Sequence, residues 1–304
     1  MKRPTKSLSL RWAGHFLDLD RRSCVMGVLN VTPDSFSDGG RFLEWEKAVE
    51  HGLQMAVDGA DIIDVGGEST RPYAEEIPAQ EELDRVLPVV HALAKELKIP
   101  ISIDTVKSTV AREALRAGAS MINDVSAFRF DPGMASLAAG AGVPVILMHM
   151  KGVPRDMQED PTYGDLMGEI ADFLKAALER AVAGGVREEM IVLDPGIGFG
   201  KTFDHNLVIL KNLRRFGSLG RPILIGPSRK AFLGRILDRK APERDTGTMA
   251  AVSAALLNGA HIVRVHNVKM AVETARVIDA VKRGRVEQGS AEVGMRNAEW
   301  GKKG

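Results

Sequence analysis

Three side chains that accept hydrogen bonds come at the ends of short apolar runs. Asp104, Asn123 and Asp194 each follow such a run directly. A buried carboxylate must be paired or must bind something, because an isolated charge is costly away from water. The two carboxylates accept hydrogen bonds, and the amide of Asn123 both accepts and donates them. The set therefore suits a flat heterocycle with amino and ring N–H donors, such as a pterin or a purine.

Basic side chains near the ends of other runs indicate anion binding. Arg71 lies in a loop that starts with two glycines, and its guanidinium can hold a phosphate through two parallel hydrogen bonds. Arg264 and His266 are two residues apart in an expected strand, so they share one face and can both contact a phosphate. A surface arginine such as Arg71, or a lone histidine, is more often structural. The presence of Arg264 on the same face is what favours a ligand for His266.

Two further loops can complete a site. Lys230 lies in a segment that we expect to lead into a helix, with Ser228 as its cap. A helix N-terminus and a nearby lysine attract anions, so a substrate carboxylate can bind there. Asn30 begins the first loop, which is polar and ends in two glycines, and its amide oxygen can bind a hard cation such as Mg²⁺.

The segment Gly196–Thr202 ends like a phosphate-binding loop, but we reject nucleotide binding. The upstream glycine that this motif needs is replaced by Pro195. The glycine spacing also differs from the dinucleotide fingerprint. We expect Phe199 to form a wall of a pocket instead. The histidines have none of the spacings typical of a zinc site.

Eight apolar runs precede these side chains and predict strands. They are almost continuous Val, Ile and Leu, which is typical of strands buried on both faces. The runs are Val25–Leu29, Ile62–Val65, Ile99–Ile103, Met121–Ile122, Val143–Met148, Ile191–Leu193, Ile223–Ile225 and Ile262–Val265. Helical patterns alternate with them over Glu44–Val57, Gln80–Leu97, Ser108–Ala117, Pro132–Ala139, Tyr163–Ala183, Asp204–Phe216, Asp245–Leu257 and Val268–Val281. Eight alternations favour a single (β/α)₈ TIM barrel of the α/β class over an open doubly wound sheet, with the site at the C-terminal ends of the strands.

Composition fits one such barrel. The chain has 304 residues and a net charge of +1, which favours neither nucleic acid nor a membrane surface as a partner. The single cysteine, Cys24, excludes an intrachain disulfide and is expected in the core. We expect a lead-in over residues 1–22, the barrel over 23–283 and a polar tail over 284–304, in a cytoplasmic protein.

The motifs resemble those of the dihydropteroate synthase family of folate biosynthesis. The match runs from about residue 23 to about residue 281, with every segment in the family's order. Residues 27–40 (GVLNVTPDSFSDGG) are the most specific segment. The others are 66–72 (GGESTRP), 194–201 (DPGIGFGK), 228–230 (SRK) and 264–266 (RVH), and 102–105, 122–124 and 147–150 agree as well.

The resemblance implies a (β/α)₈ fold and a transferase. Such an enzyme condenses (7,8-dihydropterin-6-yl)methyl diphosphate with p-aminobenzoate and forms 7,8-dihydropteroate and diphosphate. The family also implies Mg²⁺ as the cofactor, an SN1-like loss of diphosphate, a p-aminobenzoate site that takes sulfonamides, and a homodimer.

The resemblance also assigns roles to residues. The pterin site comprises Asp104, Asn123, Met148, Asp194, Lys230 and Arg264. Of these, the residues expected to be catalytic are Asp104, Asp194, Lys230 and Arg264. The diphosphate site comprises Asn30, which also binds the metal, and Thr70, Arg71, Arg264 and His266. The p-aminobenzoate site comprises Pro33, Phe36, Pro72, Phe199 and Ser228.

Two alternatives stay open. A methyltransferase on the same pterin-binding barrel would share the three acceptors but would not need Phe36 or the segment 228–230. A non-catalytic paralogue would bind a pterin without turnover. The sequence departs from the family at Asn267, where many relatives have Asp. If this position orients His266, the phosphate contact is weaker.

Overall fold

The structure, a computed structural model, describes residues 8–32, 41–70 and 74–286. Eight parallel strands in the described residues form a barrel in the order β8-β7-β6-β5-β4-β3-β10-β9. A parallel bridge between Leu193 and Ile223 closes it from β8 to the β9 side. The strands are β3 (Cys24–Asn30), β4 (Ile62–Gly66), β5 (Ile101–Asp104), β6 (Met121–Asp124), β7 (Val145–Met148), β8 (Ile191–Asp194), β9 (Leu224–Ile225) and β10 (Ile262–Val265). All eight predicted strands are therefore confirmed.

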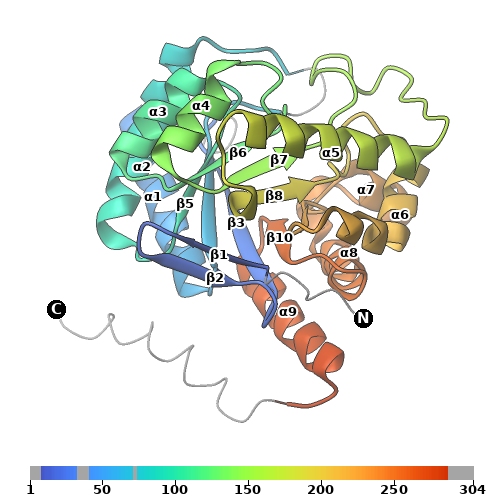
Figure 1. The fold of residues 1–304 in the computed structure, drawn as a ribbon. Coiled ribbons are helices and arrows are strands. Elements are labelled where there is room, and N and C mark those ends of the chain that lie inside the picture. The colour runs from blue at the N-terminus through green and yellow to red at the C-terminus, as the bar shows by residue number, and fades with distance from the viewer. Residues whose placement is uncertain (1–7, 33–40, 71–73, 287–304) are drawn as a thin grey trace.

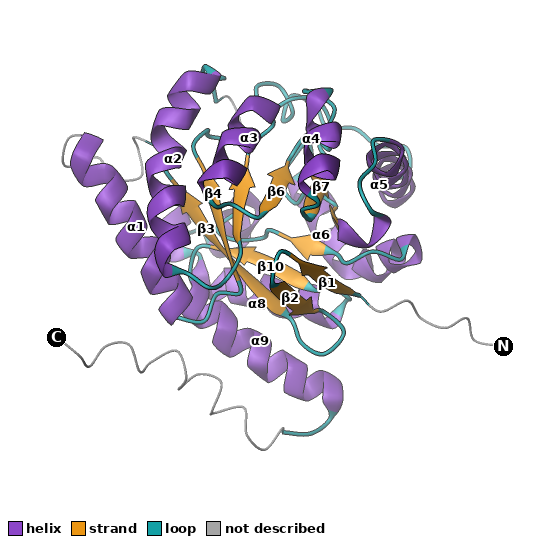
Figure 2. Ribbon diagram, turned by 60° about the vertical axis from the view of Figure 1, so that its left-hand side comes forward, coloured by secondary structure: helices purple, strands orange, loops and turns teal. Residues whose placement is uncertain are grey.

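Helices surround the strands on the outside (Figures 1 and 2). They are α1 (Arg41–Val57), α2 (Ala79–Glu96), α3 (Ser108–Ala117), α4 (Gly133–Ala141), α5 (Leu166–Ala183), α6 (Phe203–Asn212), α7 (Ala231–Leu237), α8 (Asp245–Leu257) and α9 (Val268–Arg283). Shorter 3₁₀ helices are η2 (Glu188–Met190), η3 (Leu213–Leu219) and η4 (Ala241–Glu243). The α7 helix matches the helix that we expected after Lys230, although it begins at Ala231. It was not among the periodic helical patterns, because its seven residues are too few to show a clear period.

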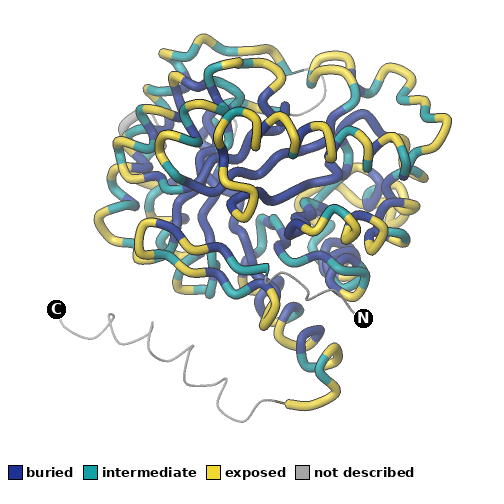
Figure 3. The backbone as a smooth tube through the Cα atoms, viewed as in Figure 1, coloured by how far each residue is buried: buried dark blue, intermediate teal, exposed yellow. Residues whose placement is uncertain are grey.

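Side chains alternate between the barrel interior and the helices along each strand. A side chain at Gly27 would collide with Met55 of α1 and Val268 of α9, so this position faces the helices. Its neighbours Met26 and Val28 therefore face the interior, because successive strand residues point to opposite faces. Figure 3 shows the strands as the buried centre of the molecule. The outward positions are apolar and pack under the helices, which explains the runs of Val, Ile and Leu.

A β-hairpin that the sequence analysis did not predict lies at the N-terminal end of the barrel. Strands β1 (Ser9–Trp12) and β2 (His15–Asp18) pair antiparallel within the predicted lead-in. Ala13 and Gly14 between them both have positive φ angles, as a tight two-residue hairpin turn requires. Leu10, Trp12 and Leu17 are buried and belong to the main core. Four-residue strands with one buried face gave too short an alternation to stand out.

None of the helices in the described part of the chain combines the length and the apolar character needed to cross a lipid bilayer.

Candidate active site

Arg264 connects the acceptors at the C-terminal end of the barrel. It lies in β10, and its Nε donates a hydrogen bond to Oδ2 of Asp64 in β4 at 2.6 Å. Its Nη2 donates to Oδ2 of Asp104, the last residue of β5, at 2.7 Å. The guanidinium therefore spans the interior past β3, which lies between β10 and β4. Within the described residues its Nη1 has no hydrogen bond, so this nitrogen can serve a ligand.

Asn123 joins the same cluster from β6. Its Nδ2 donates to Oδ2 of Asp64 at 3.0 Å, and the side chain is buried. A carboxylate can only accept, so the amide nitrogen must point towards Asp64. The amide oxygen of Asn123 is then the atom that can face a ligand.

Burial shifts the titration of the two carboxyl groups in the site. It raises the pKa of Asp194, the last residue of β8, to about 6, although the N–H of Gly196 at 2.7 Å and nearby cations favour the charged form. Burial likewise raises the pKa of Asp104 to about 7, against the attraction of Arg264. Carboxyl groups held near neutrality can gain or lose charge when a ligand changes their surroundings.

Lys230 and Phe199 form the next part of the site. The Lys230 Nζ lies 4.1 Å from the centroid of the Phe199 ring, a cation–π arrangement. Burial lowers the pKa of Lys230 to about 8. Phe199 and Met148 belong to a small apolar cluster with Val125, Met150 and Met157. A polar face and an apolar wall therefore lie side by side, as a planar aromatic ligand requires.

Ser228 and His266 form a pair beside this pocket. The Ser228 Oγ lies 2.8 Å from the His266 Nδ1, and it accepts a hydrogen bond from the His266 backbone N–H at 3.1 Å. This arrangement favours donation from the hydroxyl to Nδ1, which leaves the proton of the neutral ring on Nε2. Burial lowers the pKa of His266 to about 3, so the ring is neutral at physiological pH. A neutral imidazole with a free Nε2–H can donate to a phosphate oxygen.

Two predictions about this region are wrong. Ser228 does not cap a helix, because α7 begins at Ala231, its N-cap residue is Lys230, and no side chain caps it. The strand that was expected to carry both Arg264 and His266 ends at Val265. The two side chains go to different partners: the arginine to carboxylates, and the histidine to Ser228.

The residues expected at the diphosphate and the metal lie at the same end of the barrel. Asn30 is the half-buried last residue of β3, paired with Gly66, and Thr70 lies in the loop after β4. The described residues contain no cluster of three His, Cys, Asp or Glu side chains suited to a metal ion. Mg²⁺ at phosphate sites takes one or two protein oxygens and completes its shell with phosphate and water. The single amide oxygen of Asn30 fits that requirement when a diphosphate is present.

Four of the predicted site residues, Pro33, Phe36, Arg71 and Pro72, lie outside the described residues.

Comparisons with known proteins identify the family of the chain. Residues 26–266 match the family model of pterin binding enzymes. The chain belongs to this family. The dihydropteroate synthase of Synechocystis is 49% identical over 267 residues, which cover 88% of this chain and 92% of that protein. The predicted family, the (β/α)₈ fold and the activity of a dihydropteroate synthase, which is a transferase, are therefore confirmed.

Solved structures of the family match along the same length. The dihydropteroate synthase of Yersinia pestis in complex with a sulfonamide drug superposes with a TM-score of 0.86 at 45% identity, covering 90% of this chain and 99% of that chain. The enzyme of Xanthomonas albilineans in complex with 7,8-dihydropteroate gives a TM-score of 0.82 at 42% identity, covering 90% of this chain and 98% of that chain.

Sequence reasoning missed Asp64, which holds both Arg264 and Asn123. A signal was present, because Asp64 is a charged residue inside the apolar run Ile62–Val65. A buried charge in a strand interior requires a partner of opposite charge. The sequence could not say which basic residue that partner was.

Lys201 and His149 form a second group that was missed. The Lys201 Nζ lies 2.9 Å from the His149 Nδ1 and donates to the backbone oxygen of Phe199 at 2.9 Å. Burial lowers the pKa of Lys201 to about 7. The His149 backbone N–H donates to the backbone carbonyl oxygen of Asp194 at 2.8 Å. Lys201, the lysine of the apparent phosphate-binding motif, therefore stabilises the loop that carries Phe199.

Asn267 does not orient His266. Its side chain caps α9 by accepting from the Met270 N–H at 3.2 Å, and its Nδ2 donates to Asp245 at 3.0 Å. Ser228 is the residue that contacts the imidazole. Asn267 therefore gives no structural reason to expect a weaker phosphate contact through His266.

Proposed function

We propose that the pocket at the C-terminal end of the barrel binds the dihydropterin diphosphate and p-aminobenzoate side by side and joins them. The observation that carries this proposal is the linked cluster in which Arg264 contacts Asp104 and shares Asp64 with Asn123. The related enzyme of Xanthomonas albilineans holds 7,8-dihydropteroate, a molecule that contains both parts. Small-molecule substrates, not macromolecules, are thus the partners that we propose for this site.

The proposed pterin contacts follow from which atoms are available. The Asn123 oxygen, Asp194 and Asp104 accept hydrogen bonds from the amino group and ring N–H groups of the pterin. Lys230, held over Phe199 at 4.1 Å, donates to ring acceptors. Met148 lies against the apolar side of the same pocket, in the cluster with Phe199. The ring lies between a polar edge and an apolar wall.

The reaction that we propose needs no side-chain base to activate the nucleophile, because an arylamine is already nucleophilic. The chain's residues must help the C–O bond to the diphosphate to break. Arg264 through its Nη1, and His266 through its Nε2–H, donate to the leaving oxygens, with Thr70 and Arg71 from the loop after β4. Asp194 stabilises the cation that develops on the pterin in an SN1-like path. Phe199 and Ser228, with Pro33, Phe36 and Pro72, form the p-aminobenzoate site.

We propose that Asn30 holds Mg²⁺ against the diphosphate. The ion, when bound, neutralises charge on the leaving group. Asn30 contributes one oxygen ligand from the end of β3. Its partly exposed position allows the substrate to supply the remaining oxygens.

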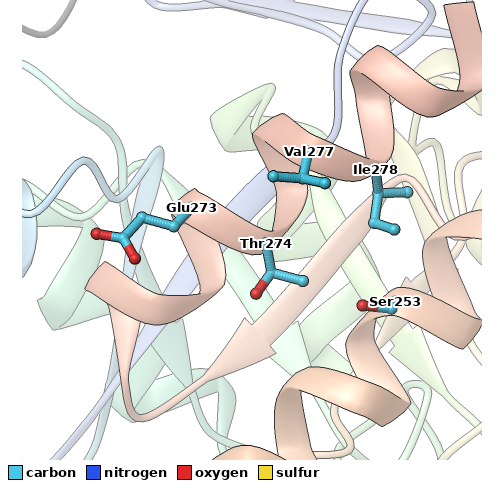
Figure 4. A pocket seen from close by; sticks show the side chains of 5 residues that line it. All are labelled: Ser253, Glu273, Thr274, Val277 and Ile278. Atoms are coloured by element: carbon cyan, nitrogen blue, oxygen red, sulfur yellow. The ribbon is translucent and has the colours of Figure 1, made fainter. Parts of the chain in front are cut away.

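We also propose a homodimer, located in the cytoplasm, that forms through α8 and α9. An open groove of about 310 Å³ lies between these helices, lined by Ser253 from α8 and by Glu273, Thr274, Val277 and Ile278 from α9 (Figure 4). Val277 and Val281 of α9 are 62% and 61% exposed. An exposed apolar stripe on neighbouring helices is suited to a self-complementary contact between two copies.

The test is an assay with dihydropterin diphosphate, p-aminobenzoate and Mg²⁺, in which dihydropteroate and diphosphate are measured. We expect equal amounts of both products, and chelation of Mg²⁺ should slow their formation. Binding of dihydropteroate without turnover would favour the non-catalytic paralogue. Methyl transfer to or from a folate, with no dihydropteroate formed, would favour the methyltransferase.

Lys230→Ala tests the residue roles in the same assay. We expect the KM values of both substrates to rise roughly 10- to 100-fold, because a charged hydrogen bond and the contact with Phe199 are lost. Lys175→Ala is the matched control, since Lys175 is exposed on α5. Unchanged KM values in Lys230→Ala would contradict the proposed site.

A further inference from the structure

Asp64 occupies an unusual place in the barrel. It lies in the middle of β4 and is fully buried, and its Oδ1 has no hydrogen-bond partner among the described residues. One of its oxygens, Oδ2, accepts from the Arg264 Nε at 2.6 Å and from the Asn123 Nδ2 at 3.0 Å. These two donors belong to residues that we place in the pterin site. A single buried oxygen therefore binds, and orients, two side chains that come from different strands.

The charge of Asp64 fixes the direction of the Asn123 amide. If this amide were flipped, its oxygen would face a carboxylate oxygen, and the two acceptors would repel each other. The observed orientation removes the amide nitrogen from the ligand side and presents only the oxygen. A pterin offers N–H donors at its pyrimidine edge, so an oxygen at this point matches it and a nitrogen would not.

Asp64 also fixes the guanidinium of Arg264. Asp64 accepts from Nε and Asp104 accepts from Nη2 at 2.7 Å, and these two hydrogen bonds together fix the orientation of the guanidinium plane. Nη1 is then directed away from both carboxylates. If the hydrogen bond to Asp64 were lost, the guanidinium could rotate about the remaining hydrogen bond to Asp104.

We propose that Asp64 is a positioning residue that determines which hydrogen-bonding atoms the pocket offers to the pterin. It acts through the Asn123 amide and the Arg264 guanidinium, and it contacts no substrate. The inference rests on the proposed residue roles in the pocket. It adds the reason why the pocket offers an oxygen at Asn123 and a nitrogen donor at Arg264.

The first experiment measures the affinity for 7,8-dihydropteroate by calorimetry in wild type and Asp64→Asn. We expect Asp64→Asn to bind roughly 10- to 100-fold more weakly, because the amide of Asn123 can then adopt both orientations and Arg264 loses a charged partner. Ser102→Ala is the matched control. Ser102 is fully buried on β5, directly opposite Asp64, and its hydroxyl has no hydrogen-bond partner in the part of the chain that the structure describes. It should bind like wild type.

The second experiment exchanges the two side chains. Asn123→Asp alone places two carboxylates against each other and should bind poorly. In the double variant Asp64→Asn with Asn123→Asp, the new amide donates to the new carboxylate, which again presents an oxygen to the pterin. We expect the double variant to bind at least about tenfold more tightly than Asn123→Asp. A residue with only a role in folding would not give this rescue.

The outcomes separate the two proposals. If wild type does not bind dihydropteroate, the proposed residue roles fail. If wild type binds, but Asp64→Asn binds equally well or the exchange gives no rescue, only the positioning role of Asp64 fails.

A third measurement covers the case in which Asp64→Asn does not fold. The side-chain amide signals of Asn123 in wild type, assigned by their absence from the spectrum of Asn123→Ala, should exchange slowly with solvent in the ligand-free protein. Exchange as fast as that of an exposed asparagine would overturn the inference.

Discussion

At the scale of single residues, burial sets the chemistry of this pocket. Asp104, Asp194 and Lys230 have their pKa values moved towards neutrality mainly because they lie away from water. A charge in such a place is stabilised by its neighbours only in part, so a ligand with complementary groups can complete its stabilisation. The pocket is therefore arranged for a polar, planar ligand before that ligand arrives.

Pterin binding should depend on pH through Asp194. The carboxylate must be ionised to accept from the pterin N–H groups, and burial raises its pKa to about 6. The contribution of Asp194 to the affinity for dihydropteroate should hence be complete above pH 6 and should fall as pH decreases through this value, approaching about tenfold per pH unit below it. Asp104, whose pKa burial raises to about 7, should add a separate decrease near pH 7. Calorimetry between pH 5 and 8 measures this profile.

Asp194→Asn provides the comparison for that profile. It should bind more weakly and lose the inflection near pH 6, whereas the exposed Asp172→Asn on α5 should behave like wild type. An inflection that persists in Asp194→Asn would assign it to another group.

At the scale of elements, the residue that precedes β3 is joined to α9 at the end of the barrel away from the pocket. Asp279 of α9 is buried and accepts from the Ser23 N–H at 2.9 Å and from the Ser23 Oγ at 2.7 Å. Ser23 directly precedes β3 and follows the hairpin. This contact ties the beginning of the barrel to its last helix, across 256 residues of sequence.

Asp279→Ala should lower the free energy of unfolding by about 2–3 kcal/mol, because two charge-assisted hydrogen bonds are lost and a buried donor is left without a partner. Urea unfolding followed by circular dichroism measures the change. Asp172→Ala, on the exposed face of α5, is the control and should change it by less than about 0.5 kcal/mol. The kcat of folded Asp279→Ala should stay close to that of wild type, and a large loss would show that the two ends of the barrel are coupled.

At the scale of the whole molecule, the contacts that stabilise the barrel and the residues of the pocket lie at opposite ends of the strands. The hairpin and the Ser23–Asp279 contact lie at the N-terminal end of the strands, whereas the pocket lies at the C-terminal end. This division is general for barrels of eight parallel strands, because the loops that follow the strands can vary without disturbing the core. The outer face of α8 and α9 belongs to neither end, and it is the face through which we propose that two copies associate.

Val277→Lys should convert the proposed dimer into a monomer. The charge would be placed in the middle of an apolar contact and would be costly to bury. Sedimentation equilibrium should give twice the mass of one chain for wild type and the mass of a single chain for the variant. Val182→Lys on α5 is matched to it, since Val182 is 43% exposed and α5 follows β7, which lies three strands from β10 around the barrel. A monomeric wild type, or a dimeric Val277→Lys, would contradict the proposed interface.

The amino-acid sequence by itself determined the strands, most of the helices and the positions of Asp104, Asn123 and Asp194 at strand ends. These features are local, because apolar periodicity and the residue that ends each run are read over a few neighbouring positions. The β1–β2 hairpin was not predicted and the first residue of α7 was misplaced, because segments of four to seven residues show too little of any period.

Only the tertiary structure decided which of these side chains meet. The ion pair of Arg264 with Asp64 joins residues that are 200 apart, and the Ser228–His266 contact joins residues that are 38 apart. Several acidic residues could have paired with Arg264 on charge alone, and Ser228 could equally have capped a helix. Barrel closure brings β10 beside β3 and close to β4, and that proximity, which no local pattern encodes, selected the partners.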